Sequence, residues 1–416
     1  MARVALFSAS VLSSAADGRR LPTLQVALGY VRACDGDLGE WERRWRSVAR
    51  ECDVEEAEKD GPLGAVERPA DGAALRARQR DVGVPRPAQL PLGPDELIGR
   101  GAERAWALGL MRSRRGTRVP LIVSGRIGVG KTAFVLVLAR EMSADFPDGQ
   151  LYLDLGADEM RDVPVSQIMA SALRALAVPP EKIPHSTGES AALFRSILSS
   201  RRILVVLDNA QGEQQILPFL VEALCSQILV TGRARMLGLD GVARMDVGTL
   251  GRPDAVALIQ SIAGPERTRT EWEPVVQIAE LCDDLPVALS IVGKQLAAHP
   301  CWTPVDALRY LREGEGFVAN LQVGELSLRG RLAAAYGPLS RRAKVALRYV
   351  SERGSAGVYP GDLAEVPGIG GGSPVLVLET LVDAGFLGTA TGSRYTMSPL
   401  LRSFVFNHSG LAGLGA

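Results

Sequence analysis

The pattern of apolar and polar positions divides most of the chain into a strand-and-helix region and a helical region. Short apolar runs that end beside a glycine or an acid lie at 119–123, 150–155, 203–207 and 227–232, with helical spacing between them. Such alternation predicts a parallel sheet that helices cover on both faces. After residue 250 the apolar positions recur at three- and four-residue steps. We therefore predict an α/β domain over 95–250 and a helical domain over 251–320.

Two segments with weaker patterns precede the predicted sheet. Residues 1–50 indicate a small all-α segment, with a helix after Asp37 whose apolar face carries Leu38, Trp41, Trp45 and Val48. Residues 51–94 alternate charges with proline and glycine and hold few large apolar side chains. Such a composition buries too little surface to offset the entropy lost on ordering, so we expect a flexible linker.

The stretch VPLIVSGRIGVGKT at 119–132 carries the strongest chemical signal. Gly125, Gly128, Gly130, Lys131 and Thr132 fit G-x-x-x-x-G-K-[ST] between a predicted strand and a predicted helix. Glycines let several backbone N–H groups face one point, and the helix adds the positive end of its dipole. In this pattern the lysine reaches the β- and γ-phosphates and the threonine hydroxyl ligates Mg²⁺. The alternative is a glycine-rich turn without a ligand.

Two further residues follow apolar strands at the edge where ligands bind in such a sheet. Asp208 follows the run 203–207, where a P-loop protein places the carboxylate associated with Mg²⁺. Arg233 follows the run 227–232 and is positioned to sense a γ-phosphate. An ordinary acid at a strand end and a surface salt bridge are the respective alternatives. Together these positions predict the fold of an α/β P-loop NTPase that binds a nucleotide.

Asn209 bears on whether that nucleotide is hydrolysed. It follows Asp208 directly, where hydrolytic P-loop proteins often carry a second acid that orients water. An amide cannot take up a proton, so we expect hydrolysis to be slow.

Composition narrows the function classes. The 47 basic and 47 acidic side chains balance, so no global field attracts nucleic acid or anionic membranes, and any DNA contact has to be local. The five cysteines are scattered without a C-x-x-C pair, which is typical of reduced thiols in a cytosol. No histidine stands at metal-ligand spacing from a cysteine, and no apolar run reaches the roughly 18 residues of a membrane span. We therefore expect a cytoplasmic protein with no zinc site and no membrane contact.

These motifs together resemble the NB-ARC branch of the STAND ATPases over roughly residues 95–408. The run LIGR at 97–100 matches the family's hydrophobic-hydrophobic-Gly-Arg entry segment, although Gly101 stands where an acid often follows. The run CDDLPVALS looks like the family's G-L-P-L motif, with Asp284 in place of glycine and Val287 in place of the second leucine. FPDGQLYLDL and LDNA are similar to the bacterial regulator subgroup. The resemblance implies a switch that binds ATP or ADP with Mg²⁺.

The resemblance also assigns site residues. Ile98 and Pro286 are expected to border the base, although Pro286 read by itself is a first-turn helix proline. Lys131, Asp208 and Arg233 are the catalytic candidates, and Thr132 and Asp208 are the expected Mg²⁺ ligands. The candidate nucleotide-contacting residues are Ile98, Gly99, Arg100, Gly125, Gly128, Val129, Gly130, Lys131, Thr132, Ala133, Pro286 and Ser398.

The C-terminal residues 321–416 resemble the winged-helix domain that closes the switch in that family. Amphipathic helices are predicted at 341–350 and 375–384, followed by a hairpin around Thr391 and Gly392. The family then shows Met-His-Asp, whose histidine holds the ADP β-phosphate. This sequence has Met397, Ser398 and Pro399 there, so the lock is altered and only a neutral hydrogen bond from Ser398 remains. We expect no repeat-type sensor after residue 408.

The N-terminal residues 1–50 resemble the latter part of the helix-turn-helix domain of bacterial nucleotide-switch regulators. The matching positions are Ser8, Leu12, Ser13, the run 18–22 and EWERRW. In that family the segment matching 8–16 is the recognition helix, which approaches bases in the major groove. Because the first helix of the domain is missing, the segment is either a DNA-binding unit or a remnant that serves packing or protein interaction.

Three functions of different classes follow from the sequence. The first is a nucleotide switch that regulates transcription, with DNA contacted through residues 1–50. The second is an ATPase that drives oligomeric assembly or defence signalling, with a second copy of the chain as partner in the ATP state. The third is a nucleotide-loaded scaffold for protein interaction without DNA binding.

Overall fold

The computed structural model describes residues 27–28, 31, 37–41, 43–44, 86–112, 118–156, 163–220, 225–268, 271–313, 317–369, 372–390 and 392–412. Two compact units comprise Met1–Val82 and Gly83–Ala416. In the first, residues 38–41 and 43–44 are helical, and the Asp37 carboxylate accepts the N–H groups of Gly39 and Glu40 at 2.8 and 3.1 Å. This cap agrees with the helix predicted after Asp37. The predicted recognition helix at 8–16 and residues 51–85 of the predicted linker lie outside the described residues.

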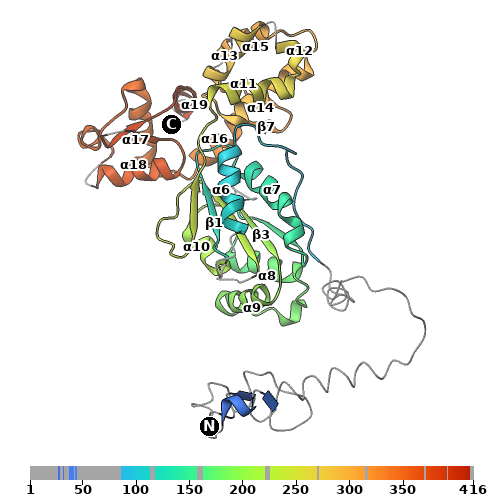
Figure 1. Cartoon of the computed structure of the whole chain (residues 1–416). Coiled ribbons are helices and arrows are strands. Elements are labelled where there is room, and N and C mark those ends of the chain that lie inside the picture. Colours follow the sequence, from blue (N-terminus) through green and yellow to red (C-terminus); the bar gives the residue numbers. More distant parts are fainter. Residues whose placement is uncertain are drawn as a thin grey trace. The chain divides into compact units, whose positions relative to one another are not determined.

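A five-stranded parallel sheet forms the centre of what we call the sheet domain, residues 95–250 (Figure 1). The strand order is β2-β3-β4-β1-β5. The strands are β1 (Leu121–Ser124), β2 (Gln150–Asp154), β3 (Leu204–Ala210), β4 (Gln227–Gly232) and β5 (Ala243–Asp246). The first four agree with the predicted runs, whereas β5, on the edge beside β1, was not predicted. Its sequence ARMD contains an arginine and an acid, so no apolar run marks it.

Alternate residues of the central strands point to opposite faces of the sheet, and each face has its own core. Val205 and Leu207 belong to one hydrophobic cluster, while Leu204 and Val206 belong to the other. Helices α8 (Val165–Ala175) and α9 (Thr187–Ser200) cover the first face. Helices α6 (Gly101–Arg112) and α7 (Lys131–Glu141) cover the second. The sheet therefore has helices on both faces, as the sequence predicted.

The stretch 86–94, which the sequence assigned to the end of the linker, is paired with the sheet domain. Ala88 forms a parallel bridge with Gln150 at the start of β2. The Arg140 guanidinium, on α7, donates to the carbonyl oxygens of Pro91, Gly93 and Pro94 at 2.8–3.2 Å. Residues 86–94 contain too few apolar side chains to be ordered by burial. The backbone pairing with β2 and the hydrogen bonds from Arg140 hold this segment instead.

The second hydrophobic cluster continues beyond the sheet into the helical part, residues 251–320. Its helices are α11 (Arg252–Ala263), α12 (Pro265–Thr268), α13 (Trp272–Leu281), α14 (Pro286–Ala298) and α15 (Pro304–Arg312). Helix α14 packs along α11, and Gly293 allows the approach because a Cβ there would lie 2.9 Å from Ile262. This packing sets the first turn of α14 against the sheet domain.

The described residues of the C-terminal part, within 321–412, form four α-helices, two short 3-10 helices and two hairpins. The helices are α16 (Leu328–Tyr336), α17 (Arg341–Glu352), α18 (Pro374–Asp383) and α19 (Pro399–Ala412), and the hairpins are β6 (Gln322–Val323) with β7 (Leu326–Ser327) and β8 (Gly388–Ala390) with β9 (Arg394–Thr396). The β8–β9 hairpin lies where the sequence predicted one. Helix α17 packs on α18 and α19.

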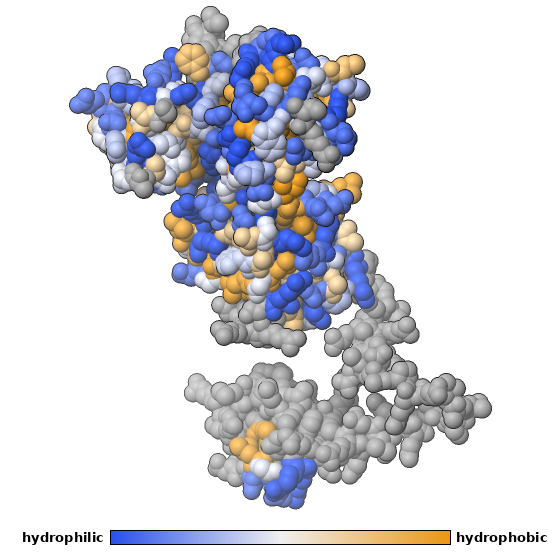
Figure 2. Space-filling view, turned by 45° about the horizontal axis from the view of Figure 1, so that its top comes forward, coloured by the Kyte–Doolittle hydropathy of each residue, from blue (hydrophilic) through white to orange (hydrophobic). Residues whose placement is uncertain are grey.

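Hydrophilic and hydrophobic residues are interspersed on the face of the second unit, Gly83–Ala416, that Figure 2 shows. None of the helices in the described part of the chain is long and apolar enough to cross a membrane.

Candidate functional site

The glycine loop, residues 125–132, leaves β1 and leads into α7 through left-handed backbone. Gly125, Gly128 and Gly130 have φ of 149°, 82° and 91°. A Cβ on Gly125 would lie 2.3 Å from the Val247 carbonyl oxygen, and one on Gly128 would lie 2.3 Å from Val287. Conformation and space therefore both require glycine at these two positions.

Lys131 lies at the first position of α7, with its ammonium group turned back into the glycine loop. The Nζ atom donates to the carbonyl oxygens of Gly125 and Arg126 at 2.8 and 2.9 Å. Burial, and next the nearby charge of Arg233, lower the pKa of Lys131 to about 8. The ammonium thus still carries its proton at neutral pH, in a place where an anion would be attracted.

Asp208 is 1% exposed, and hydroxyl groups surround its carboxylate. Oδ1 accepts from Thr132 at 3.0 Å and also from Thr231, while Oδ2 accepts from Tyr152 at 2.7 Å. Burial and Asp208 raise the pKa of Tyr152, so its hydroxyl remains a donor. The residue lies within β3, which continues to Ala210, and not after the strand end as the sequence suggested.

The residues around Asp208 fit a Mg²⁺ ion. A buried carboxylate and the Thr132 hydroxyl supply the hard oxygen donors that Mg²⁺ prefers, and phosphates and water commonly complete its shell. The sequence analysis did not identify Tyr152 and Thr231. The sequence of a strand does not show which residues of the adjacent strands its side chains will contact. The alternation of β2 gave one signal, since it places the polar Tyr152 and Asp154 on the same face.

Asn209 reaches back to the neighbouring strand. Its φ is 59°, a left-handed conformation that asparagine tolerates better than most residues. The side-chain amide donates to Asp154 Oδ1 at 3.0 Å, and its backbone N–H donates to the Thr231 hydroxyl at 3.0 Å. An amide paired with a carboxylate therefore stands beside Asp208.

The entry segment is held under the glycine loop by Arg100. Its buried guanidinium donates to the carbonyl oxygens of Val129 and Gly248 at 3.4 and 2.5 Å. Gly99 has φ 69°, and a Cβ there would lie 2.6 Å from Asp254 on α11. Arg100 and Gly99 thus join the glycine loop to the helical part, while Ile98 faces the cavity described below.

The first turn of α14 contacts the glycine loop directly. The Val287 N–H donates to the Gly128 carbonyl at 3.1 Å. Arg126 and Asp283 form an ion pair at 2.7 Å across the same boundary. Pro286 is the first residue of α14. This position fits both interpretations of Pro286, as a proline that starts a helix and as a residue that borders the base.

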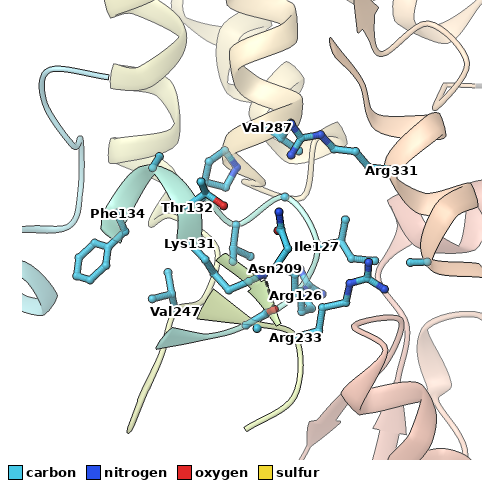
Figure 3. A pocket seen from close by; sticks show the side chains of 18 of the residues that line it. Arg126, Ile127, Lys131, Thr132, Phe134, Asn209, Arg233, Val247, Val287 and Arg331 are labelled. Carbon is cyan, nitrogen blue, oxygen red and sulfur yellow. Dashed lines mark hydrogen bonds between the residues drawn. The ribbon is translucent and has the colours of Figure 1, made fainter. Parts of the chain in front are cut away.

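An open cavity of about 2880 Å³ lies where the three parts meet. That is more than the roughly 300–1,000 Å³ of a typical ligand pocket, so the space extends beyond one bound molecule. Most predicted site residues line it, including Lys131, Asn209 and Arg233 around the loop in Figure 3. Those lining it are Ile98, Arg100, Gly125, Gly128, Val129, Gly130, Lys131, Thr132, Ala133, Arg233 and Pro286. Gly99 and Asp208 stand behind this wall.

Ser398 does not line the cavity. Its hydroxyl accepts the Leu401 N–H at 3.4 Å and its carbonyl accepts the Arg402 N–H at 2.9 Å, so it caps α19. Met397 is buried in the core and Pro399 begins α19. The structure therefore brings Ser398 to a helix end and not to the glycine loop.

The fold defines the class of protein. A search of family models found no match. Among solved structures, a Walker-type ATPase of Pyrococcus abyssi aligns with a TM-score of 0.53 at 14% identity, and the match covers 77% of this chain and 98% of that one. Such a likeness shows the fold alone, and with the glycine loop it defines an α/β P-loop NTPase.

Sequence relatives narrow the class. Regulatory protein AfsR of Streptomyces coelicolor is 33% identical over 325 residues, which are 77% of this chain and 33% of the relative. A probable disease resistance protein of Arabidopsis thaliana is 28% identical over 224 residues, which are 51% of this chain and 25% of the relative. The chain belongs to the NB-ARC-type P-loop ATPases. It spans about a third of the length of the curated regulator that it matches.

Proposed function

We propose that this chain is an ATP- and ADP-binding switch that regulates transcription. The observation that carries the proposal is the hydrogen bond between Thr132 and Asp208 beside the charged Lys131, at the wall of a cavity that the sheet domain, the helical part and the C-terminal part share. Residues of all three parts line that cavity, and we propose that the nucleotide contacts each of them. Its chemical state can therefore favour one arrangement of them over another.

Each side chain has a distinct task in this proposal. The N–H groups of the glycine loop and the positive end of α7 bind phosphate oxygens, and Lys131 neutralises them. Thr132 and Asp208 hold Mg²⁺, which neutralises charge on the β- and γ-phosphates when it is bound. Arg233 senses the γ-phosphate from the end of β4. Ile98 and Pro286, from two different parts, border the base.

Hydrolysis is slow in this proposal. Asn209 carries no proton-accepting carboxylate, and its amide is already engaged with Asp154 at 3.0 Å. Each nucleotide state then lasts long enough to act as a signal. Turnover well above about 0.01 per second would instead favour the ATPase alternative.

The regulatory role is supported by the similarity to a regulatory protein, and its transcriptional character rests on the resemblance of residues 1–50 to part of a helix-turn-helix domain. The regulator is 33% identical to this chain over 325 residues, which are 77% of this chain. Helices α17 and α18 followed by the β8–β9 hairpin have the order of a winged helix, which we propose closes on the nucleotide. DNA is then contacted through residues 1–50, and a second copy of the chain is a partner in the ATP state.

Nucleotide binding is tested by identifying what the purified protein releases on heat denaturation and by titrating it with a fluorescent ADP in the presence of Mg²⁺. Lys131→Ala is expected to weaken binding at least tenfold. Lys182→Ala is the matched control, because Lys182 is exposed and does not line the cavity. Absence of adenine-nucleotide affinity, or equal affinity in the two variants, would overturn the proposal.

The DNA role has its own experiment. Binding of a promoter fragment at low salt is compared between the ADP form and a form loaded with a non-hydrolysable ATP analogue. The two forms are expected to differ in affinity, with binding that weakens as salt rises. Nucleotide binding without any DNA affinity would leave the protein-interaction scaffold as the function.

A further inference from the structure

Arg331 is a cation on the wall of the nucleotide cavity with no partner in the described part of the chain. It lies on α16, in the C-terminal part, and lines the same cavity as Lys131 and Arg126. Figure 3 shows its side chain extending from the C-terminal part toward Val287, which contacts the glycine loop. None of the described residues forms a hydrogen bond or an ion pair with its guanidinium.

None of the described acids that line this cavity forms an ion pair with Arg331, and several of them are engaged elsewhere. Asp283 pairs with Arg126 at 2.7 Å, and Asp246 pairs with Arg235 at 3.0 Å. The Glu379 carboxylate accepts the Tyr395 hydroxyl. A guanidinium is always charged at physiological pH, so Arg331 adds a fixed positive charge to this wall.

The sequence of α16 presents this charge to the cavity. Leu328 and Leu332 are buried and attach the helix to the core. Arg331, Ala334 and Ala335 line the cavity at the i, i+3 and i+4 positions of one helical face. Two alanines leave room beside the guanidinium for a ligand.

The charge of Arg331 reaches the glycine loop. It is among the groups that lower the pKa of Lys131, together with Arg233. Cations from the glycine loop, from the end of β4 and from α16 therefore share one cavity. Their mutual repulsion is relieved by an anion placed between them.

We propose that Arg331 binds the terminal phosphates of the nucleotide and thereby couples the C-terminal part to the nucleotide state. This inference rests on the proposed function. A guanidinium can bind two phosphate oxygens at once. Ser398 caps α19, and among the described residues of the C-terminal part that line the cavity Arg331 has the cationic side chain, so Arg331 is the residue that binds the phosphates from this part.

The experiment compares Arg331→Ala with Arg329→Ala. Arg329 lies on the same helix, is exposed and does not line the cavity. Its replacement by alanine therefore makes the same change in net charge and in helix propensity without touching the cavity. Fluorescent ADP and ATP are titrated in the presence of Mg²⁺, and AMP is used as a competitor. We expect Arg331→Ala to weaken ADP and ATP binding about tenfold, with little change for AMP and no change in Arg329→Ala.

Thermal unfolding of the nucleotide-free variants checks that they fold, and Arg331→Gln serves if the alanine variant does not. Equal ADP and ATP affinities in the Arg331 and Arg329 variants would overturn the inference while leaving the proposed function intact. An equal loss for AMP would also overturn it, because the effect would not come from the terminal phosphates. A native protein that binds no adenine nucleotide would instead overturn the proposed function.

Discussion

Arg252 and Asp284 form a two-pronged ion pair, with Nε to Oδ1 at 2.6 Å and Nη2 to Oδ2 at 3.1 Å. The pair joins the first residue of α11 to the loop before α14. Asp284 has φ 49°, the left-handed conformation that explains why the family places glycine there. Asp284 therefore combines an ion pair to Arg252 with a backbone conformation that only glycine adopts without strain.

Substitutions of Asp284 separate backbone conformation from the ion pair. Both Asp284→Gly and Asp284→Ala remove the carboxylate, but only glycine adopts φ 49° freely. We expect the glycine variant to be more stable than the alanine variant by about 1 kcal/mol. Urea unfolding gives the free energies of unfolding. Equal stabilities would mean that this backbone conformation carries no cost.

The lowered pKa of Lys131 predicts that nucleotide affinity depends on pH. In the proposed function the protonated ammonium binds phosphate, and the pKa of Lys131 is lowered to about 8. Raising the pH from 7 to 9 should therefore weaken ADP binding about tenfold, because most of the protein must first take up a proton. Titrations with fluorescent ADP at both pH values measure the change.

Lys131→Arg is the control for this pH dependence, since its guanidinium keeps its charge. Its affinity, even if lower throughout, should not change between pH 7 and 9. A parallel fall in the arginine variant would assign the effect to another group.

Tyr152→Phe tests how the Asp208 carboxylate is oriented. The hydroxyl donates to Asp208 at 2.7 Å and is expected to position the carboxylate for Mg²⁺. Loss of such an outer-shell hydrogen bond should raise the Mg²⁺ concentration that half-saturates nucleotide binding about tenfold. Tyr310→Phe, on the exposed side of α15, is the control. An unchanged Mg²⁺ requirement would make the Tyr152 contact a purely structural one.

Ser398→Ala distinguishes a helix cap from a phosphate ligand. Because the hydroxyl caps α19, we expect a loss of about 1 kcal/mol in stability and no change in the rate of ADP release. Stopped-flow release of a fluorescent ADP and thermal unfolding give the two quantities. Faster ADP release would mean that the serine contacts the phosphate, as the family resemblance implies.

Local sequence identified those parts of the site that neighbours in the chain create. The positions of Gly125, Gly128, Lys131 and Thr132 follow from one motif, since backbone conformation and helix start are set within a few residues. The β8–β9 hairpin was likewise predictable from its turn. Edge strand β5 was not, because ARMD shows no apolar run and is defined by pairing with β1.

The sequence by itself determined the glycine loop with its lysine and threonine and the division between strands and helices, because both depend on short-range spacing. Only the tertiary structure decided that Tyr152 and Thr231 hold Asp208, that Arg331 enters the cavity and that Ser398 caps a helix. These relationships join residues from different elements. The packing of those elements against a shared core sets them, and spacing along the chain does not encode them.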